Sequence, residues 1–366
     1  MTAPHDQSIT WLALHLVEGL GPVACARLLA RFEGPEEIFS ATLTELKAAG
    51  VRGDAARNIK ARVFRADPET EWRRAGRCGA RILSLGDPGY PALLREIHDP
   101  PVILYARGRD LPAGGRFISV VGSRSATRYG IRVAERIGRE LGRSGIGVVS
   151  GLALGVDSAA HRGCLAGRGF TVAVLGTGID VAYPRSNRHL FREIEKHGLI
   201  LSEFPLGTPP EPWNFPVRNR IISGISRGVV VVEAARKSGS LITASQALEQ
   251  GREVFAVPGS IDSAKSGGTH FLIKQGAKLV EGVKDILEEL HPSEGPYEGM
   301  EVSEDGTLAG LDEDERRIFQ IVGPYPQQMD EIVRASGMEP GRVAGLLLRL
   351  ELKGRVTQLA GNRFVR

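Results

Sequence analysis

Short runs of apolar residues alternate with amphipathic stretches between about residues 78 and 282 of this 366-residue chain. The runs are rich in Val and Ile and are apolar throughout, which is typical of strands in a parallel sheet covered by helices on both faces. The pattern therefore predicts an α/β fold: an extended Rossmann-like, doubly wound and mostly parallel sheet. The predicted strands are 80–85, 102–106, 117–121, 147–150, 171–175, 199–203, 229–233 and 253–257, and the helices between them include 130–142, 157–166, 188–197 and 241–249.

The N-terminal flank of this core has a helical pattern. Apolar positions recur at helical spacing over 9–17, 22–32 and 35–39, and the segment Gly19-Leu20-Gly21-Pro22 joins the first two helices. This indicates a helical domain over residues 1–64 that is helix-hairpin-helix-like, whose turn could direct backbone amides at a phosphate. A plain helical bundle with a tight turn fits the pattern equally well. The core then extends over residues 65–290.

The C-terminal flank is separated from the core by residues 291–310, which are rich in Gly, Pro and acidic residues and are predicted to form a linker. Beyond it, the pattern predicts helices at 312–322, 329–336 and 340–352, followed by two short strands near Val356 and Phe364. This succession predicts a winged-helix domain over residues 311–366. Its third helix has only Arg342, Arg349 and Lys353 as cations, so both duplex reading and protein docking stay open.

The loops that follow the predicted strands carry candidate phosphate ligands. Ligands bind outside the carboxyl ends of the strands in doubly wound sheets, where amides, hydroxyls and guanidinium groups can hold phosphate oxygens. A single such loop can simply turn the chain, but several at one sheet edge suit the backbone of a polymer. The candidates are Gly122, Ser123 and Arg124, then Gly151, then Arg185 after Tyr183-Pro184, and then Ser238, Gly239 and Ser240.

The segment Trp213-Asn214-Phe215-Pro216-Val217-Arg218-Asn219-Arg220 combines aromatic side chains with two arginines and an amide. Bases stack on aromatic rings for roughly 1–3 kcal/mol each while Arg contacts the backbone, so the segment predicts a platform for single-stranded nucleic acid. We expect Phe215 to stack and Arg218, Asn219 and Arg220 to bind phosphate. The alternative is that the aromatic residues belong to the core and the arginines are structural ion-pair partners.

Composition and missing motifs narrow the function further. The net charge is +4, the three cysteines are scattered, and no apolar run approaches the roughly 20 residues of a membrane span, so we expect a cytoplasmic protein with neither disulfides nor a zinc module. Neither G-x-x-x-x-G-K-[ST] nor a strand-linked G-x-G-x-x-G occurs, and the histidines lack metal spacing. A triad could be imagined from Asp157, Ser158 and His161, although a histidine satisfied by its neighbours is the simpler interpretation. No catalytic residue, metal or cofactor is expected.

The motifs together resemble the DNA-processing protein A (DprA/Smf) family. The resemblance is carried, in order, by VVGSR at 120–124, VVSGLALGVDSAAHRG at 148–163, TVAVLGTGIDVAYPRSN at 171–187, LSEFP at 201–205, FPVRNRIISGIS at 215–226, VVVEAARKSGSLITA at 230–244 and REVFAVPG at 252–259. The N-terminal helices resemble the SAM-like domain of longer members and the C-terminal segment resembles their winged helix.

This resemblance implies a homodimer that protects incoming single-stranded DNA and loads a RecA-type recombinase onto it in natural transformation. It places the family's phosphate-binding loop on Gly122, Ser123 and Arg124, and its basic residue after Tyr-Pro on Arg185. The rival hypothesis is a nucleotide phosphoribohydrolase on a related Rossmann-like fold, whose P-G-G-x-G-T segment is only echoed at 258–260 and 266–269.

Overall fold

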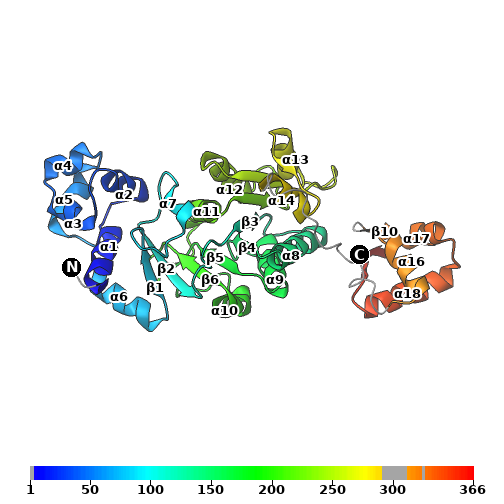
Figure 1. Cartoon of the computed structure of the whole chain (residues 1–366). Helices are drawn as coiled ribbons and strands as arrows, with labels where there is room; N and C mark the ends of the chain where they lie inside the picture. The colour runs from blue at the N-terminus through cyan, green and yellow to red at the C-terminus, as the bar shows by residue number, and fades with distance from the viewer. Residues whose placement is uncertain (1–3, 291–310, 324–325) are drawn as a thin grey trace. The chain divides into compact units, whose positions relative to one another are not determined.

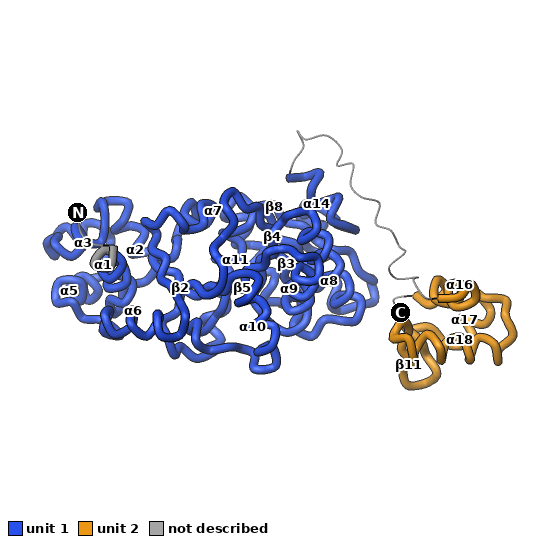
Figure 2. The backbone as a smooth tube through the Cα atoms, turned by 60° about the horizontal axis from the view of Figure 1, so that its bottom comes forward, with its two compact units in different colours: residues 1–293 blue, residues 294–366 orange. Residues whose placement is uncertain are grey.

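The computed structural model describes residues 4–290, 311–323 and 326–366. The chain forms two compact units, residues 1–293 and residues 294–366 (Figure 2). Each unit is described by itself below. The predicted linker at 291–310 lies outside the described residues.

The first unit is built on a sheet of nine strands in the order β1-β2-β6-β5-β4-β3-β7-β8-β9. Strands β3 to β9 pair in parallel, whereas β1 and β2 join the β6 edge in antiparallel fashion. The order runs in opposite directions on the two sides of β3, which creates a switch point where its carboxyl end lies beside that of β7. The strands are β1 Arg81–Ser84, β2 Ile103–Gly108, β3 Phe117–Val121, β4 Gly147–Ser150, β5 Thr171–Leu175, β6 Leu199–Ser202, β7 Gly228–Val231, β8 Glu253–Ala256 and β9 Lys278–Leu279.

Helices cover both faces of this sheet (Figure 1). Val120 and Val230 face one hydrophobic cluster with α8 (Arg128–Arg143), α9 (Val156–Ala166) and α14 (Val283–Leu290). Val121 and Val231 face the opposite cluster with α11 (Asn214–Ile225) and α12 (Gly239–Glu249). The remaining helices of the core are α7 (Ala92–Arg95), α10 (Arg188–His197) and α13 (Gly267–Lys274). The doubly wound, mostly parallel α/β fold predicted from the apolar runs is confirmed.

Helices α8 and α9 pack unusually close together because small residues line their contact. A Cβ added to Gly163 would lie 2.0 Å from the carbonyl oxygen of Glu135, and one added to Gly138 would lie 2.4 Å from that of Ala160. Side chains at these positions would push the helices apart. The close contact fixes the starts of both helices, and therefore the two loops that precede them, after β3 and β4.

The N-terminal helices share a hydrophobic core with the sheet rather than enclosing one of their own. Leu12 and Leu16 belong to the same buried cluster as Ile103 and Tyr105 of β2. In Figure 1, α1 and α6 lie beside β1, and the other N-terminal helices lie farther from the sheet. These helices and the sheet therefore belong to one compact unit, and the domain boundary at residue 64 stays a prediction. The helices are α1 Pro4–Leu16, α2 Pro22–Leu29, α3 Pro35–Ser40, α4 Leu43–Ala48, α5 Gly53–Ala61 and α6 Pro68–Arg77.

The second unit has the winged-helix arrangement. Helices α16 (Glu313–Ile321), α17 (Met329–Ser336) and α18 (Pro340–Leu352) enclose a small core that includes Ile318, Leu346 and Phe364. A three-stranded sheet completes it in the order β10-β12-β11, with β10 Gln327–Gln328, β11 Thr357–Leu359 and β12 Arg363–Val365.

The two cations of α18 and Lys353, which directly follows this helix, are paired within the unit. Arg342 pairs with Asp314, Arg349 lies 3.6 Å from Asp312, and Lys353 lies 2.6 Å from Glu315. All three carboxylates lie at the start of α16. The carboxylates cancel much of the positive charge that a helix reading duplex DNA would present to phosphates.

Candidate nucleic-acid interface

A cavity of about 630 Å³ opens at the switch point of the sheet. Its walls come from the loops after β3 and β7, the start of α11 and the start of α12. The lining residues are Val121, Gly122, Ser123, Arg124, Ala153, Asp157, Tyr183, Pro210, Pro212, Phe215, Pro216, Arg218, Asn219, Ile222, Ala235, Lys237, Ser238, Gly239, Ser240, Ile242 and Thr243. Segments up to about 120 residues apart in the sequence thus meet at one opening.

The loop after β3 is held by Glu233, which follows β7. The backbone amide of Ser123 donates to the Glu233 carbonyl oxygen at 2.7 Å, and Thr127 donates to the Glu233 carboxylate from its amide (2.9 Å) and its hydroxyl (2.5 Å). A Cβ on Gly122 would lie 2.9 Å from the Glu233 carbonyl oxygen and 2.7 Å from Val156, so this close approach requires glycine. The loop therefore has a fixed shape before any ligand arrives.

The loop after β7 leads into α12, whose N-terminus faces the cavity. The Ser238 hydroxyl accepts from the amide of Ser240 at 3.4 Å and lies 2.8 Å from the Ser240 hydroxyl. Lys237 is exposed at the same rim. Amides and hydroxyls at a helix N-terminus, together with an exposed cation, are a typical setting for an anion.

Arg218 is buried beneath the cavity, where its side chain connects the loop after β4 to β5. Its guanidinium donates to the carbonyl oxygens of Gly151, at 2.8 Å, and of Val174. Asp157 accepts from the amides of Gly151 (3.1 Å) and Ala153 (3.4 Å). Burial lowers the pKa of Arg218 to about 10, so it stays positively charged at neutral pH. Burial raises the pKa of Asp157, and the nearby Arg218 guanidinium opposes that shift. The pair fixes the loop after β4.

The ring of Phe215 lies between the backbone at Gly176 and the guanidinium of Arg124. The Arg124 guanidinium carbon is 4.9 Å from the centre of the Phe215 ring, and the Tyr183 ring centre is 6.0 Å from it. On another side, a Cβ on Gly176 would lie 2.9 Å from the ring. Phe215 therefore positions Arg124, and a smaller hollow of about 60 Å³ lies beside both residues and Gly151.

The matches to protein families and to curated relatives cover most of the chain. The DNA recombination-mediator protein A family matches residues 81–291, and the DprA winged-helix domain family matches residues 303–362. Protein Smf of Synechocystis sp. is 36% identical over 395 residues, covering 99% of each chain. The DNA processing protein DprA of Bacillus subtilis is 47% identical over 58% of this chain and 72% of its own.

The chain belongs to the DprA/Smf family of DNA recombination-mediator proteins. Two solved DprA structures also resemble it. That of Streptococcus pneumoniae DprA has a TM-score of 0.68 at 36% identity, covering 79% of this chain and 99% of its own. That of Helicobacter pylori DprA has a TM-score of 0.53 at 29% identity, covering 58% and 96%. The latter was described as giving insights into a single-stranded DNA binding mode of that protein.

Most of the residues predicted as ligands in this DprA family member come together at the cavity. The lining includes Gly122, Ser123, Arg124, Phe215, Arg218, Asn219, Ser238, Gly239 and Ser240. Of these, Arg218 is only 3% exposed and its guanidinium is bonded to backbone carbonyl oxygens. Gly151 is buried and borders only the smaller hollow, where its amide and carbonyl are used internally. Arg185 is exposed in a short 3-10 turn (Arg185–Asn187) and borders neither. Whether these residues bind DNA stays a prediction.

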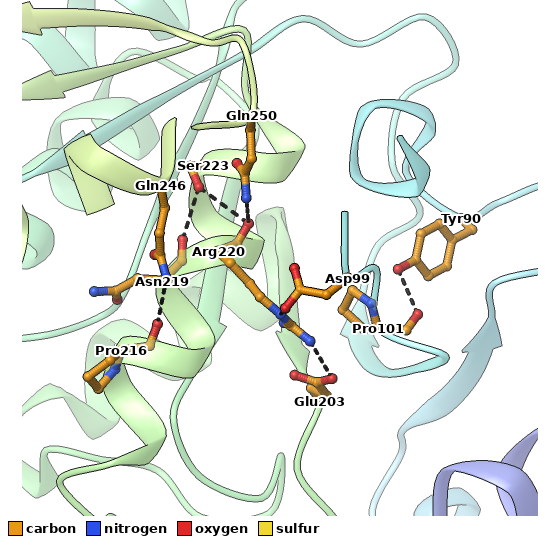
Figure 3. Close-up of polar contacts among 10 residues, drawn as sticks. All are labelled: Tyr90, Asp99, Pro101, Glu203, Pro216, Asn219, Arg220, Ser223, Gln246 and Gln250. Atoms are coloured by element: carbon orange, nitrogen blue, oxygen red, sulfur yellow. Dashed lines mark hydrogen bonds and ion pairs between the residues drawn. The ribbon is translucent and has the colours of Figure 1, made fainter. Parts of the chain in front are cut away.

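Arg220 lies apart from the other predicted ligands. Its side chain is only 5% exposed, and its guanidinium pairs with Asp99 at 3.0 Å and Glu203 at 2.7 Å (Figure 3). It does not line the cavity, since it projects from the other side of α11. The alternative considered for this arginine, a structural ion-pair partner, describes what is observed.

Several residues of the site were not assigned from the sequence. Glu233, Lys237 and Asp157 stand in or beside quoted motifs, but their roles depend on loops that meet only in three dimensions. The imagined triad does not form, because Ser158 donates to the Ala153 carbonyl oxygen at 2.5 Å and His161 contacts the Thr171 hydroxyl at 2.7 Å. Burial lowers the pKa of His161 to about 3, so this histidine is neutral. Among the described residues, no group of three or more metal-ligating side chains gathers, and no helix is long and apolar enough to cross a membrane.

Proposed function

We propose that this protein binds single-stranded DNA in the switch-point cavity, protects it, and loads a RecA-type recombinase onto it during natural transformation. The observation that carries the proposal is the convergence of Ser123, Arg124, Lys237 and Ser240 on one opening of about 630 Å³. Hydroxyls, amides and cations in one hollow suit a phosphate, and the aromatic rings beside them suit unpaired bases.

A single strand fits this geometry better than a duplex. The cavity is a recess at the edge of the sheet, so a flexible backbone can bend its phosphate into it while a rigid duplex cannot. Phe215 and Tyr183 lie close to Arg124, and stacking on rings requires bases that are not already paired. The membership of the chain in a recombination-mediator family supports the same reading.

The recombinase, the homodimer and the cytoplasmic location are parts of the proposal that rest on the family resemblance. Dimer formation is measured by light scattering of the purified protein. Loading is measured as faster assembly of recombinase on single strands that carry a blocking single-strand-binding protein. The same reaction with a cavity variant such as Arg124→Ala should be accelerated less at limiting protein concentration, because DNA capture precedes loading.

The function is tested by titrating a labelled single strand and the matching duplex at two salt concentrations. We expect tighter binding of the single strand, with log affinity falling against log salt by about 0.7 per neutralised phosphate. Equal affinity for the duplex would contradict the proposal. The rival hypothesis, a phosphoribohydrolase, predicts release of bases from nucleoside monophosphates, and turnover in that assay would favour it.

A further inference from the structure

Trp213 is a large aromatic side chain left in solvent beside the cavity. It is 67% exposed, whereas Trp11 is 8% exposed within the core. Phe215 offers much less free surface, because Gly176 lies against one part of its ring and the Arg124 guanidinium lies 4.9 Å from its centre. The most open ring surface near the cavity is therefore that of Trp213.

The position of Trp213 at the rim follows from its neighbours. Pro212 and Phe215 on either side of it line the cavity, as does Pro216. Residues three and four positions apart share one face of a helix, so Trp213 lies on the same face as Pro216 and Val217, and Val217 is 41% exposed. Across the cavity mouth, Ile242 of α12 is 42% exposed and also lines the cavity.

The segment that carries Trp213 is rigid. Its preceding residues include Pro209, Pro210 and Pro212, whose rings fix the backbone. Asn214 anchors the turn by donating from its side chain to the Gly176 carbonyl oxygen at 3.1 Å and from its amide to the Glu211 carbonyl oxygen at 3.0 Å. A platform fixed in advance loses little entropy when a ligand stacks on it.

We propose that Trp213 is a base-stacking platform at the cavity rim, for a nucleotide next to the one whose phosphate lies between Arg124 and Lys237. This rests on the proposed function and deepens it. A nucleobase is favoured over a protein side chain because Trp213, although not itself a lining residue, lies in the chain between Pro212 and Phe215, which line the cationic, hydroxyl-containing cavity. Only a polyanion with flat apolar groups uses both surfaces. The strand would leave the cavity over the start of α11.

The test uses the tryptophan's own fluorescence. Oligo-dT is titrated into the wild-type protein and into Trp213→Ala and Trp213→Phe variants, with Leu248→Ala as control, since Leu248 is 61% exposed on α12 and does not line the cavity. We expect quenching in the wild type that both Trp213 variants lose. Trp213→Ala should bind about 5- to 160-fold more weakly with an unchanged salt slope, because no charge is removed. Trp213→Phe should keep most of the affinity, and Leu248→Ala all of it.

The outcomes separate this inference from the function on which it rests. If the wild type binds oligo-dT without quenching, or if Trp213→Ala binds as tightly as the wild type, the platform is wrong while single-strand binding stands. A change of oligomeric state in Trp213→Ala with unchanged DNA affinity would assign the patch to a protein interface and overturn the inference. No binding by the wild type would overturn both.

Discussion

Two arginines of this protein should respond to substitution in opposite ways. Arg220 is buried against Asp99 and Glu203, so Arg220→Met leaves two carboxylates without their partner. Removing one member of a buried ion pair costs roughly 3–5 kcal/mol of unfolding free energy. For a unit of this size, with an unfolding entropy of about 0.6 kcal/mol/K, we expect the melting temperature to fall by roughly 5–8 °C. Its affinity for single-stranded DNA below that temperature should stay close to that of the wild type, because Arg220 lies outside the cavity.

Arg124 should show the reverse. It is exposed at the cavity mouth, so Arg124→Ala leaves no buried charge and should barely change the melting temperature. If it neutralises one phosphate, its loss removes about 0.7 from the salt slope. That slope corresponds to a loss in affinity of about eightfold at 0.05 M salt and about threefold at 0.2 M.

Both variants are measured by thermal melting followed by circular dichroism and by fluorescence anisotropy with a labelled oligonucleotide at the two salt concentrations. The anisotropy is recorded at 15 °C, where both proteins are folded. The reasoning fails if Arg220→Met melts normally but binds DNA weakly, since that result would make Arg220 a DNA ligand. It also fails if Arg124→Ala binds as tightly as the wild type at 0.05 M salt.

Two further predictions concern Arg218 and the winged helix. Arg218→Met should destabilise the first unit increasingly as pH rises from about 4 to 7. Burial already raises the pKa of Asp157, and the fold is therefore more stable when this carboxyl group is protonated than when it is ionised. Loss of the opposing Arg218 charge raises the pKa of Asp157 further, so the cost of the substitution grows as the carboxyl group ionises. Urea unfolding at pH 4.5 and 7.5 measures this, and an equal loss at both pH values would argue against the pairing. In the second unit, Arg342→Ala with Arg349→Ala should leave duplex affinity of the full chain within about twofold, because both cations are already paired. A tenfold loss in gel shifts would show that they read DNA.

The sequence predicted the sheet and most of the cavity because both depend on local signals. Apolar runs identified every strand except the two-residue strands β9 and β10, which are too short to show a period. Loops after parallel strands necessarily meet at one sheet edge, so Ser123 and Ser240 could be placed together without coordinates.

The placement of Arg220 outside the cavity has a specific physical cause. Residues 214–225 form a helix, but their sequence shows no clear alternation of apolar and polar faces, because residues on both sides of the helix are buried. Pro216 stands near the start of the helix, where proline is tolerated. Residues two apart on a helix point about 200° from each other, so Arg218 and Arg220 cannot both face the cavity. The carboxylates that receive Arg220 come from distant segments, which only the fold brings near.

In the winged helix, the sequence identified the charged residues but not which of them pair. Its three cations were visible in the sequence, and so were the acidic residues at 312–315, but the pairing between α16 and α18 depends on how the helices cross. Electrostatic cancellation of this kind cannot be read from the charge of one helix. It explains why the sequence left open the choice between duplex reading and protein docking, which the double substitution at Arg342 and Arg349 tests.

The path of the strand is tested most directly by photo-cross-linking. Oligonucleotides carrying one 5-iododeoxyuridine at successive positions are bound, irradiated and digested, and the cross-linked peptides are identified by mass spectrometry. We predict adducts in the peptides that contain Trp213 and Phe215 and in those around Arg124 and Lys237. Adducts confined to residues 311–366 or to the N-terminal helices would place the strand elsewhere and contradict the account.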